Sequence, residues 1–198
     1  MSFEHFVRHA RRHPSTLSAA RRQQLAAGQK PSALFIGCSD SRVIPSQITG
    51  AEPGTLFELR TAGNVVPKYA PDSASSEMAT IEYAVLQLRV PDIIVCGHSH
   101  CGAVTALTMA GRGLEELPAL CTWLGTGGLT GVDPEDPSVR SESKRHILEQ
   151  LRTLREYPFI RDRIDAGELR LHGWFYEIDT GLVFACPQSP DEPDFLPL

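Results

Sequence analysis

The sequence lacks any long hydrophobic run, and no stretch of its 198 residues approaches the roughly 20 consecutive apolar residues that a membrane-spanning helix needs. Its first 13 residues, MSFEHFVRHARRH, also lack the apolar central region of a signal peptide. We therefore expect a cytoplasmic protein that does not enter a membrane.

An excess of positive charge is absent as well. Lysine and arginine number 19 against 24 aspartates and glutamates, which gives a formal net charge of −5. A chain with this balance has no broad basic field for nucleic acid or anionic lipid, and we expect neither as a partner. The length and the 41% hydrophobic content instead fit one ordinary globular domain.

Cysteine occurs only five times, and no two copies form a Cys-x-x-Cys pair, which argues against thiol redox chemistry. In a reducing cytoplasm an odd number of cysteines needs no pairing, so metal binding and core packing remain as explanations. We interpret Cys96, Cys121 and Cys186 as small side chains of the core.

Short apolar runs alternate with segments of helical periodicity, which predicts an α/β fold with a mostly parallel sheet of about four strands. We expect helices on both faces, an antiparallel edge strand at 182–186, and an N-terminal helical arm. Residues 1–198 are expected to form a single domain, with the arm at 1–30 and an α/β core at 31–198. Strands are expected at 33–37, 55–60, 91–96 and 171–178; helices at 3–10, 15–27, from Asp72 or Ser73 to Leu88, 103–110, 147–154 and 158–166; and a loop at 125–137.

Three soft metal ligands stand at the ends of two predicted strands. Cys38 follows ALFIG, and His98 and Cys101 lie in GHSHCGA, which follows DIIVC. The carboxyl ends of neighbouring parallel strands meet at one edge of a sheet, so these residues can share one ion. Two thiolates and an imidazole select zinc, and three protein ligands leave a fourth position for water.

Asp40 leaves two interpretations of that fourth position open. It lies two residues after Cys38 in CSDSR, near enough to bind the zinc as its fourth ligand. Arg42 lies two residues further on, and a guanidinium can hold a carboxylate bidentately and away from the metal. In the second case the carboxylate would be aimed at the metal-bound water as an acceptor.

The motifs CSDSR at 38–42 and GHSHCGA at 97–103 together resemble the paired signature of the β-class carbonic anhydrases, which are zinc enzymes. The resemblance extends over nearly the whole chain, through EPGTLFELRTAGNVVP at 52–67, IEYAVLQLRVPDIIVCGH at 81–98 and LHGWFYEIDTG at 171–181. It implies reversible hydration of carbon dioxide to bicarbonate and a proton by attack of zinc-bound hydroxide.

The resemblance also implies roles for individual residues. Cys38, His98 and Cys101 would hold one zinc ion per subunit, and Asp40 and Arg42 would form the catalytic dyad. Members are typically dimers or tetramers in which the N-terminal helices wrap around the partner, so we expect a homodimer or a tetramer. Further positions match substrate-binding residues of the family: Gln29, Phe57, Ala62, Tyr83 and Gly102.

The chain departs from the family pattern at three places. Thr61 stands where the family usually has the first Asn of Arg-Asn-x-x-Asn, and His146 stands where an Asn is expected. The Gly- and Pro-rich segment 125–137 has little similarity to typical members. We expect a different loop hydrogen bond near the site, without loss of activity.

Two rival functions and one further role stay open. A zinc hydroxide also attacks carbonyl sulfide or carbon disulfide, so pocket access could favour another small substrate. Alternatively, Asp40 could close the zinc in a non-catalytic module, although Arg42 argues against this. His100 lies beside the predicted site and is a candidate proton shuttle, although neighbouring side chains on a turn often point apart.

Overall fold

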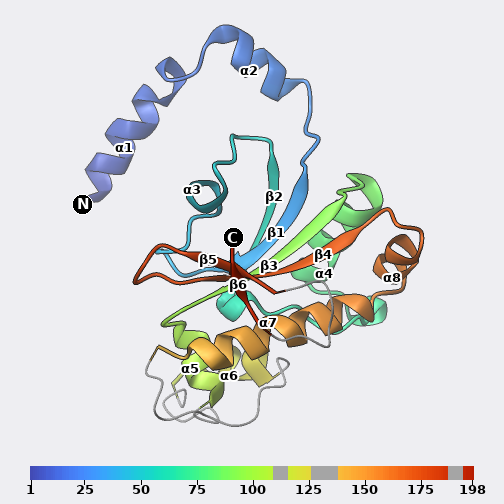
Figure 1. The fold of residues 1–198 in the computed structure, drawn as a ribbon. Helices are drawn as coiled ribbons and strands as arrows, with labels where there is room; N and C mark the ends of the chain where they lie inside the picture. Colours follow the sequence, from blue (N-terminus) through green and yellow to red (C-terminus); the bar gives the residue numbers. More distant parts are fainter. Residues whose placement is uncertain (109–115, 126–137, 187–193) are drawn as a thin grey trace. The chain divides into compact units, whose positions relative to one another are not determined.

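The computed structural model describes residues 1–108, 116–125, 138–186 and 194–198. The chain divides into two compact units, Met1–Lys30 and Pro31–Leu198 (Figure 1). Within the described ranges, no helix combines the length and the apolar character needed to cross a membrane.

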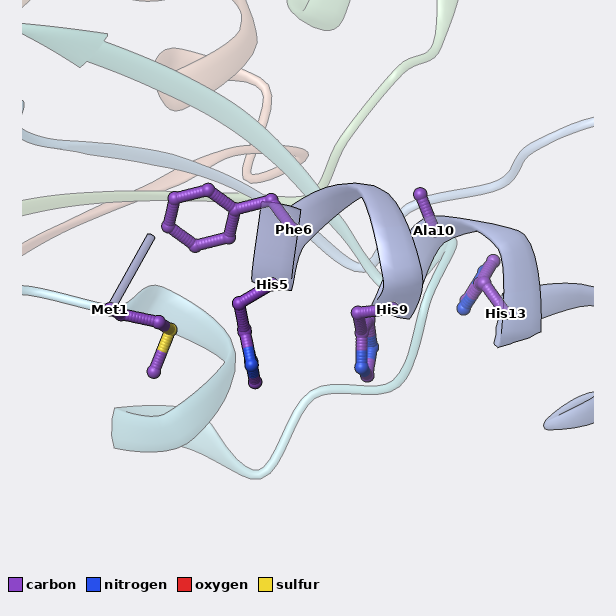
Figure 2. A pocket seen from close by; sticks show the side chains of 6 residues that line it. All are labelled: Met1, His5, Phe6, His9, Ala10 and His13. Carbon is purple, nitrogen blue, oxygen red and sulfur yellow. The ribbon is translucent and has the colours of Figure 1, made fainter. Parts of the chain in front are cut away.

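The N-terminal unit consists of α1 (Phe3–Arg12), a 3-10 turn (His13–Ser15) and α2 (Ala19–Ala26). The helix expected from residue 15 starts later because Ser18 caps α2, accepting from the Arg21 N–H at 3.1 Å. Apolar side chains of α1 are exposed, Phe3 to 75% and Phe6 to 57%. A hollow beside α1 is lined by six residues (Figure 2), namely Met1, His5, Phe6, His9, Ala10 and His13.

The second unit is built on a six-stranded sheet with the order β2-β1-β3-β4-β5-β6. Strands β1 to β4 are parallel, and β5 and β6 run antiparallel at one edge, which confirms the predicted fold class. The outermost strand β6 was not predicted, because two residues are too few to show a periodic pattern. The strands are β1 (Ala33–Cys38), β2 (Leu56–Thr61), β3 (Asp92–His98), β4 (Arg170–Tyr176), β5 (Val183–Ala185) and β6 (Leu196–Pro197).

Alternate residues of β1 supply the cores on the two faces of the sheet. Leu34 and Ile36 join the larger cluster with side chains of α4 (Ser76–Glu82), α7 (Arg140–Arg155) and α8 (Pro158–Asp165). Phe35 belongs to a smaller cluster on the other face, with Ala33, Ile94 and Cys96. All six residues of β1 are buried, as its continuous apolar run predicts.

Helix α7 packs closely on β3 and β4 because these strands carry glycine beneath it. A Cβ at Gly97 would lie 2.9 Å from two side-chain atoms of Ile147. A Cβ at Gly173 would lie 2.7 Å from the Cys186 sulfur and 3.0 Å from Ile147. The two glycines therefore set how near α7 approaches the sheet.

Other elements differ from expectation in their bounds. Helix α4 starts at Ser76 because a 3-10 turn (Pro71–Ser73) precedes it and Ser75 caps it, accepting from the Met78 N–H at 3.2 Å. Beyond α4 the chain continues through a π-helical turn (Tyr83–Gln87). Three short helices complete the unit, α3 (Pro45–Thr49), α5 (Gly102–Thr108) and α6 (Pro118–Gly125).

The core assignment of Cys121 is wrong. Cys121 is exposed on α6, whereas Leu124 on the same helix is buried, so the cysteine lies on the outward side. Cys96 is buried and Cys186 partly buried, as expected. The expected loop at 125–137, after its first residue, and the expected end of the helix at 103–110 lie outside the described residues.

Candidate metal centre

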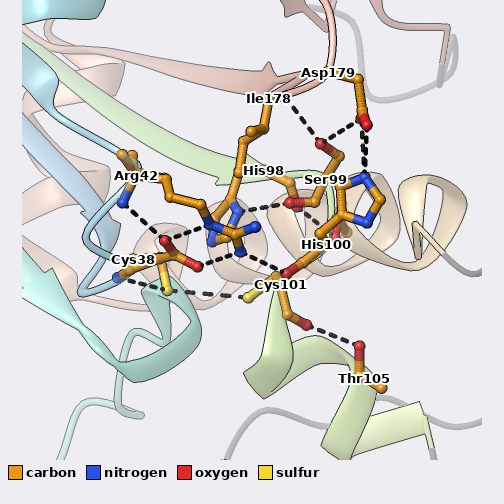
Figure 3. A network of polar contacts seen from close by, with 12 residues as sticks. Cys38, Arg42, His98, Ser99, His100, Cys101, Thr105, Ile178 and Asp179 are labelled. Atoms are coloured by element: carbon orange, nitrogen blue, oxygen red, sulfur yellow. Dashed lines mark hydrogen bonds and ion pairs between the residues drawn. The ribbon is translucent and has the colours of Figure 1, made fainter.

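The three side chains predicted as metal ligands lie together at the carboxyl ends of β1 and β3 (Figure 3). One ligand atom from each of Cys38, His98 and Cys101 lies within 4.8 Å of the other two, and all three residues are buried. The two sulfurs are 4.0 Å apart. Among the described residues this is the one such group of three or more.

The His98 ring is oriented for metal binding. Its Nδ1 lies 2.8 Å from the Ser99 carbonyl oxygen, which can only accept, so Nδ1 carries the proton and donates. The lone pair is therefore on Nε2. That atom is buried and has no hydrogen-bond partner within the described ranges. A buried imidazole lone pair beside two sulfurs fits zinc.

The two cysteines are electrostatically unequal. The pKa of Cys38 is lowered to about 4, chiefly because its sulfur accepts a hydrogen bond from Cys101, with help from the Asp40 N–H at 3.4 Å and from the Gly63 backbone. The pKa of Cys101 is raised because the proton is shared with Cys38 and the thiol is buried. A divalent cation between the sulfurs would favour the thiolate form of both.

Arg42 holds Asp40 outside the metal-ligand group. Its Nε and Nη2 donate to the two carboxylate oxygens at 3.0 and 2.7 Å, and its backbone N–H donates to Oδ1 at 2.9 Å. These contacts hold the pKa of Asp40 well below its usual range. Asp40 is thus a carboxylate that can accept hydrogen bonds beside the centre.

Arg60 fixes the segment that carries Cys38 and Asp40, a role that the sequence analysis missed. Its Nη2 donates to the carbonyl oxygens of Cys38, Asp40 and Val43 at 3.0, 2.8 and 2.7 Å. The sequence indicated this role only by placing an arginine near the end of β2. In the structure Arg60 pairs in register with Gly37 of β1.

A second polar network surrounds His100, whose backbone has a positive φ of 56° (Figure 3). Its Nε2 lies 2.9 Å from Asp179, and its carbonyl oxygen accepts from Arg42 Nη2 at 3.1 Å. Ser99 Oγ donates to Asp179 at 3.3 Å and accepts from the Ile178 N–H at 2.9 Å. The turn at 179–181 thus contacts the segment that carries His98 and Cys101. The role of His100 as a shuttle stays a prediction.

The expected substrate-binding residues are placed differently from one another. Ala62 follows β2 directly, and Gly102 begins α5 directly after Cys101. Phe57 pairs with Leu34, four residues before Cys38, and its ring lies 5.9 Å from that of Tyr83, so neither aromatic joins the metal-ligand group within one chain. Gln29 is exposed in the N-terminal unit. The substrate-binding roles of all five residues stay predictions.

The sequence and the fold have counterparts among known proteins. The family model for carbonic anhydrase matches residues 33–183. A curated carbonic anhydrase of Pseudomonas aeruginosa is 42% identical over 170 residues, covering 82% of this chain and 76% of the relative. The solved β-carbonic anhydrase CcaA matches with a TM-score of 0.87 and 36% identity, over 98% of this chain and 91% of that one. A structure of tetrameric β-carbonic anhydrases from Sordaria macrospora matches with a TM-score of 0.67 and 28% identity, over 92% of each chain.

Proposed function

Because this chain belongs to the β-class carbonic anhydrases, we propose that it uses zinc to hydrate carbon dioxide reversibly, forming bicarbonate and a proton. The observation that supports zinc is the buried group of Cys38, His98 and Cys101, in which His98 directs an unpartnered lone pair toward two sulfurs. Zinc bound there would lower the pKa of water and so supply hydroxide near neutral pH.

Asp40 and Arg42 orient the attacking oxygen in this proposal. A carboxylate whose pKa is held low accepts a hydrogen bond and does not compete as a donor. Arg42 fixes both carboxylate oxygens, so the acceptor has one direction. The Gly102 N–H, at the start of α5, is the proposed contact for the anionic product.

The proposed assembly is a homodimer or a tetramer. Tetrameric β-carbonic anhydrases from Sordaria macrospora share the fold, and α1 exposes Phe3 and Phe6. An amphipathic helix whose apolar side is exposed in one chain is suited to cover a partner. A cytoplasmic location stays a prediction.

The test is stopped-flow carbon dioxide hydration by metal-quantified protein over a range of pH. We expect Asp40→Asn to keep its zinc and to lose turnover on the order of 10- to 100-fold, because the Asp40 carboxylate orients the attacking oxygen without binding the metal. Cys101→Ala should lose both zinc and turnover, because a buried ligand is removed. Cys121→Ala is the matched control, since that cysteine is exposed, and it should change neither quantity.

Full zinc occupancy without carbon dioxide hydration at any pH would contradict the proposed reaction. Hydrolysis of carbonyl sulfide by the same sample would then identify a different small substrate. If the zinc-loaded protein catalysed neither reaction, it would be a non-catalytic zinc module.

A further inference from the structure

Two polar side chains of α7 are fully buried against the segment that follows β2. His146 and Gln150 are one helical turn apart and are 0% and 1% exposed. His146 Nε2 lies 2.7 Å from the Gly63 carbonyl oxygen, and Gln150 Oε1 accepts from the Val66 N–H at 2.8 Å. Gln150 Nε2 lies 3.4 Å from His146 Nδ1.

These contacts define the protonation of the ring. A carbonyl oxygen accepts only, so Nε2 carries the proton and Nδ1 is the acceptor that faces the Gln150 amide. Burial lowers the pKa of His146, which favours this neutral form. The ring therefore acts as a directed donor to one carbonyl group.

Gly63 connects this donor to the metal centre. Its backbone is among the groups that lower the pKa of the Cys38 thiol, and its carbonyl oxygen accepts from His146 Nε2 at 2.7 Å. The residue has a φ of +71°, and a Cβ here would lie 2.9 Å from the Ala103 Cβ. Glycine adopts this conformation freely whereas other residues are strained in it, so Gly63 can lie directly against Ala103, two residues after Cys101.

Both departures from the family pattern near the site act on this same segment. Thr61 Oγ1 donates to the Val65 carbonyl oxygen at 3.1 Å, and His146 bonds to Gly63 between them. The position of His146 is itself fixed, because Ile147 packs against the glycines of β3 and β4. The helix therefore offers a rigid support for the turn at 62–64.

We propose that His146 is a positioning residue for the metal centre: through Gly63 it holds the turn at 62–64 beside Cys38 and against α5, the helix that begins directly after Cys101. Gln150 supports His146 from the next turn of α7. This inference rests on the proposed zinc function, and it adds a chain-specific outer contact to the ligand group. Outer contacts of this kind orient the first ligands and tune metal binding.

The test compares three variants of the full chain: His146→Leu, His146→Gln and Leu154→Ala. Leucine removes the donor, whereas the amide nitrogen of glutamine can reach the place of Nε2. Leu154 is fully buried two turns further along α7, so Leu154→Ala is a matched destabilised control. Zinc affinity is measured by chelator competition, the metal environment by the thiolate-to-metal absorption with cobalt, and folding by thermal unfolding.

We expect His146→Leu to weaken zinc binding by about 10-fold or more and to change the cobalt spectrum. His146→Gln should restore both, and Leu154→Ala should lower the unfolding temperature while leaving both unchanged. The proposal is overturned if His146→Leu loses stability as Leu154→Ala does but keeps the native affinity and spectrum. A natural sequence that binds neither zinc nor cobalt would instead overturn the proposed function itself.

Discussion

Asp92, at the start of β3, lies at the opposite end of that strand from His98 and forms its own charged cluster. Arg170 Nε and Nη2 donate to its two oxygens at 2.8 Å each, and His172 Nε2 lies 2.7 Å from Oδ1. Burial raises the pKa of Asp92, but the hydrogen bonds from Arg170 and His172 outweigh it and leave the pKa below its usual value. The cluster ties β3 to β4 at the edge remote from the metal centre.

Asp92→Asn is expected to destabilise the fold in a pH-dependent way. A carboxylate whose pKa is lower in the folded state than in the unfolded chain stabilises the fold at pH values above its ordinary pKa. This stabilisation is lost as the pH falls through the lowered pKa of the folded state. Because Arg170 is largely exposed, the loss at pH 7 should be no more than about 1 kcal/mol. Urea unfolding of both proteins at about pH 7 and pH 3 measures it, and a difference that does not shrink in acid would contradict the assignment.

At this scale the sequence predicts ligand residues better than the contacts that orient them. Cys38, His98 and Cys101 could be predicted because each ends or follows a strand with a clear apolar run. Gly63 and Arg60 could not, because their partners depend on which strands become neighbours. No local pattern in the sequence shows that a glycine carbonyl oxygen will accept from a histidine 83 residues away.

At the scale of elements, α7 packs closely on the glycines beneath it. Gly97 and Gly173 lie on neighbouring strands, and Ile147 occupies the space that their missing Cβ atoms leave. Helix position and strand composition are therefore matched. This matching places His146 opposite Gly63, so it serves the metal centre as well as the core.

Gly97→Ala should destabilise the protein by about 1–3 kcal/mol, because the added methyl overlaps Ile147. Combining it with Ile147→Ala removes both Ile147 atoms at 2.9 Å, so the double variant should be more stable than the sum of the two single effects. Gly125→Ala is the control, since a methyl group added at that residue would have no neighbour within 4 Å among the described residues. Chemical unfolding of the four variants gives the coupling free energy between positions 97 and 147. Strictly additive losses of stability would show that the structure relieves the overlap by moving other groups.

Element types could be predicted more securely than their bounds. The apolar runs at 33–37 and 91–96 became β1 and β3, because a buried parallel strand needs an unbroken apolar sequence. The starts of α2 and α4 were misplaced by a few residues because a serine cap, rather than the apolar period, decides where each helix begins. Helix α6 was not predicted, since its short sequence shows little periodicity.

At the scale of the whole molecule, we expect the apolar side of α1 to contribute to assembly. Replacing Phe3 and Phe6 together by serine should weaken self-association, because exposed aromatic side chains gain most from being covered. Replacing Arg8 and Arg12 together by serine, on the polar side of α1, is the matched control. Sedimentation over a dilution series measures the effect, and equal association by both double variants would contradict a role for the apolar side.

The placement of β1 between β2 and β3 has a consequence for the order of events during folding. Cys38 and Cys101 are 63 residues apart in the chain, and Cys38 approaches His98 only after β1 and β3 have paired. Parallel pairing across such a separation is slow, because a long loop must close before any contact forms. In the proposed zinc enzyme, metal capture would follow sheet formation, so zinc should slow unfolding of the native protein while leaving the rate of refolding nearly unchanged.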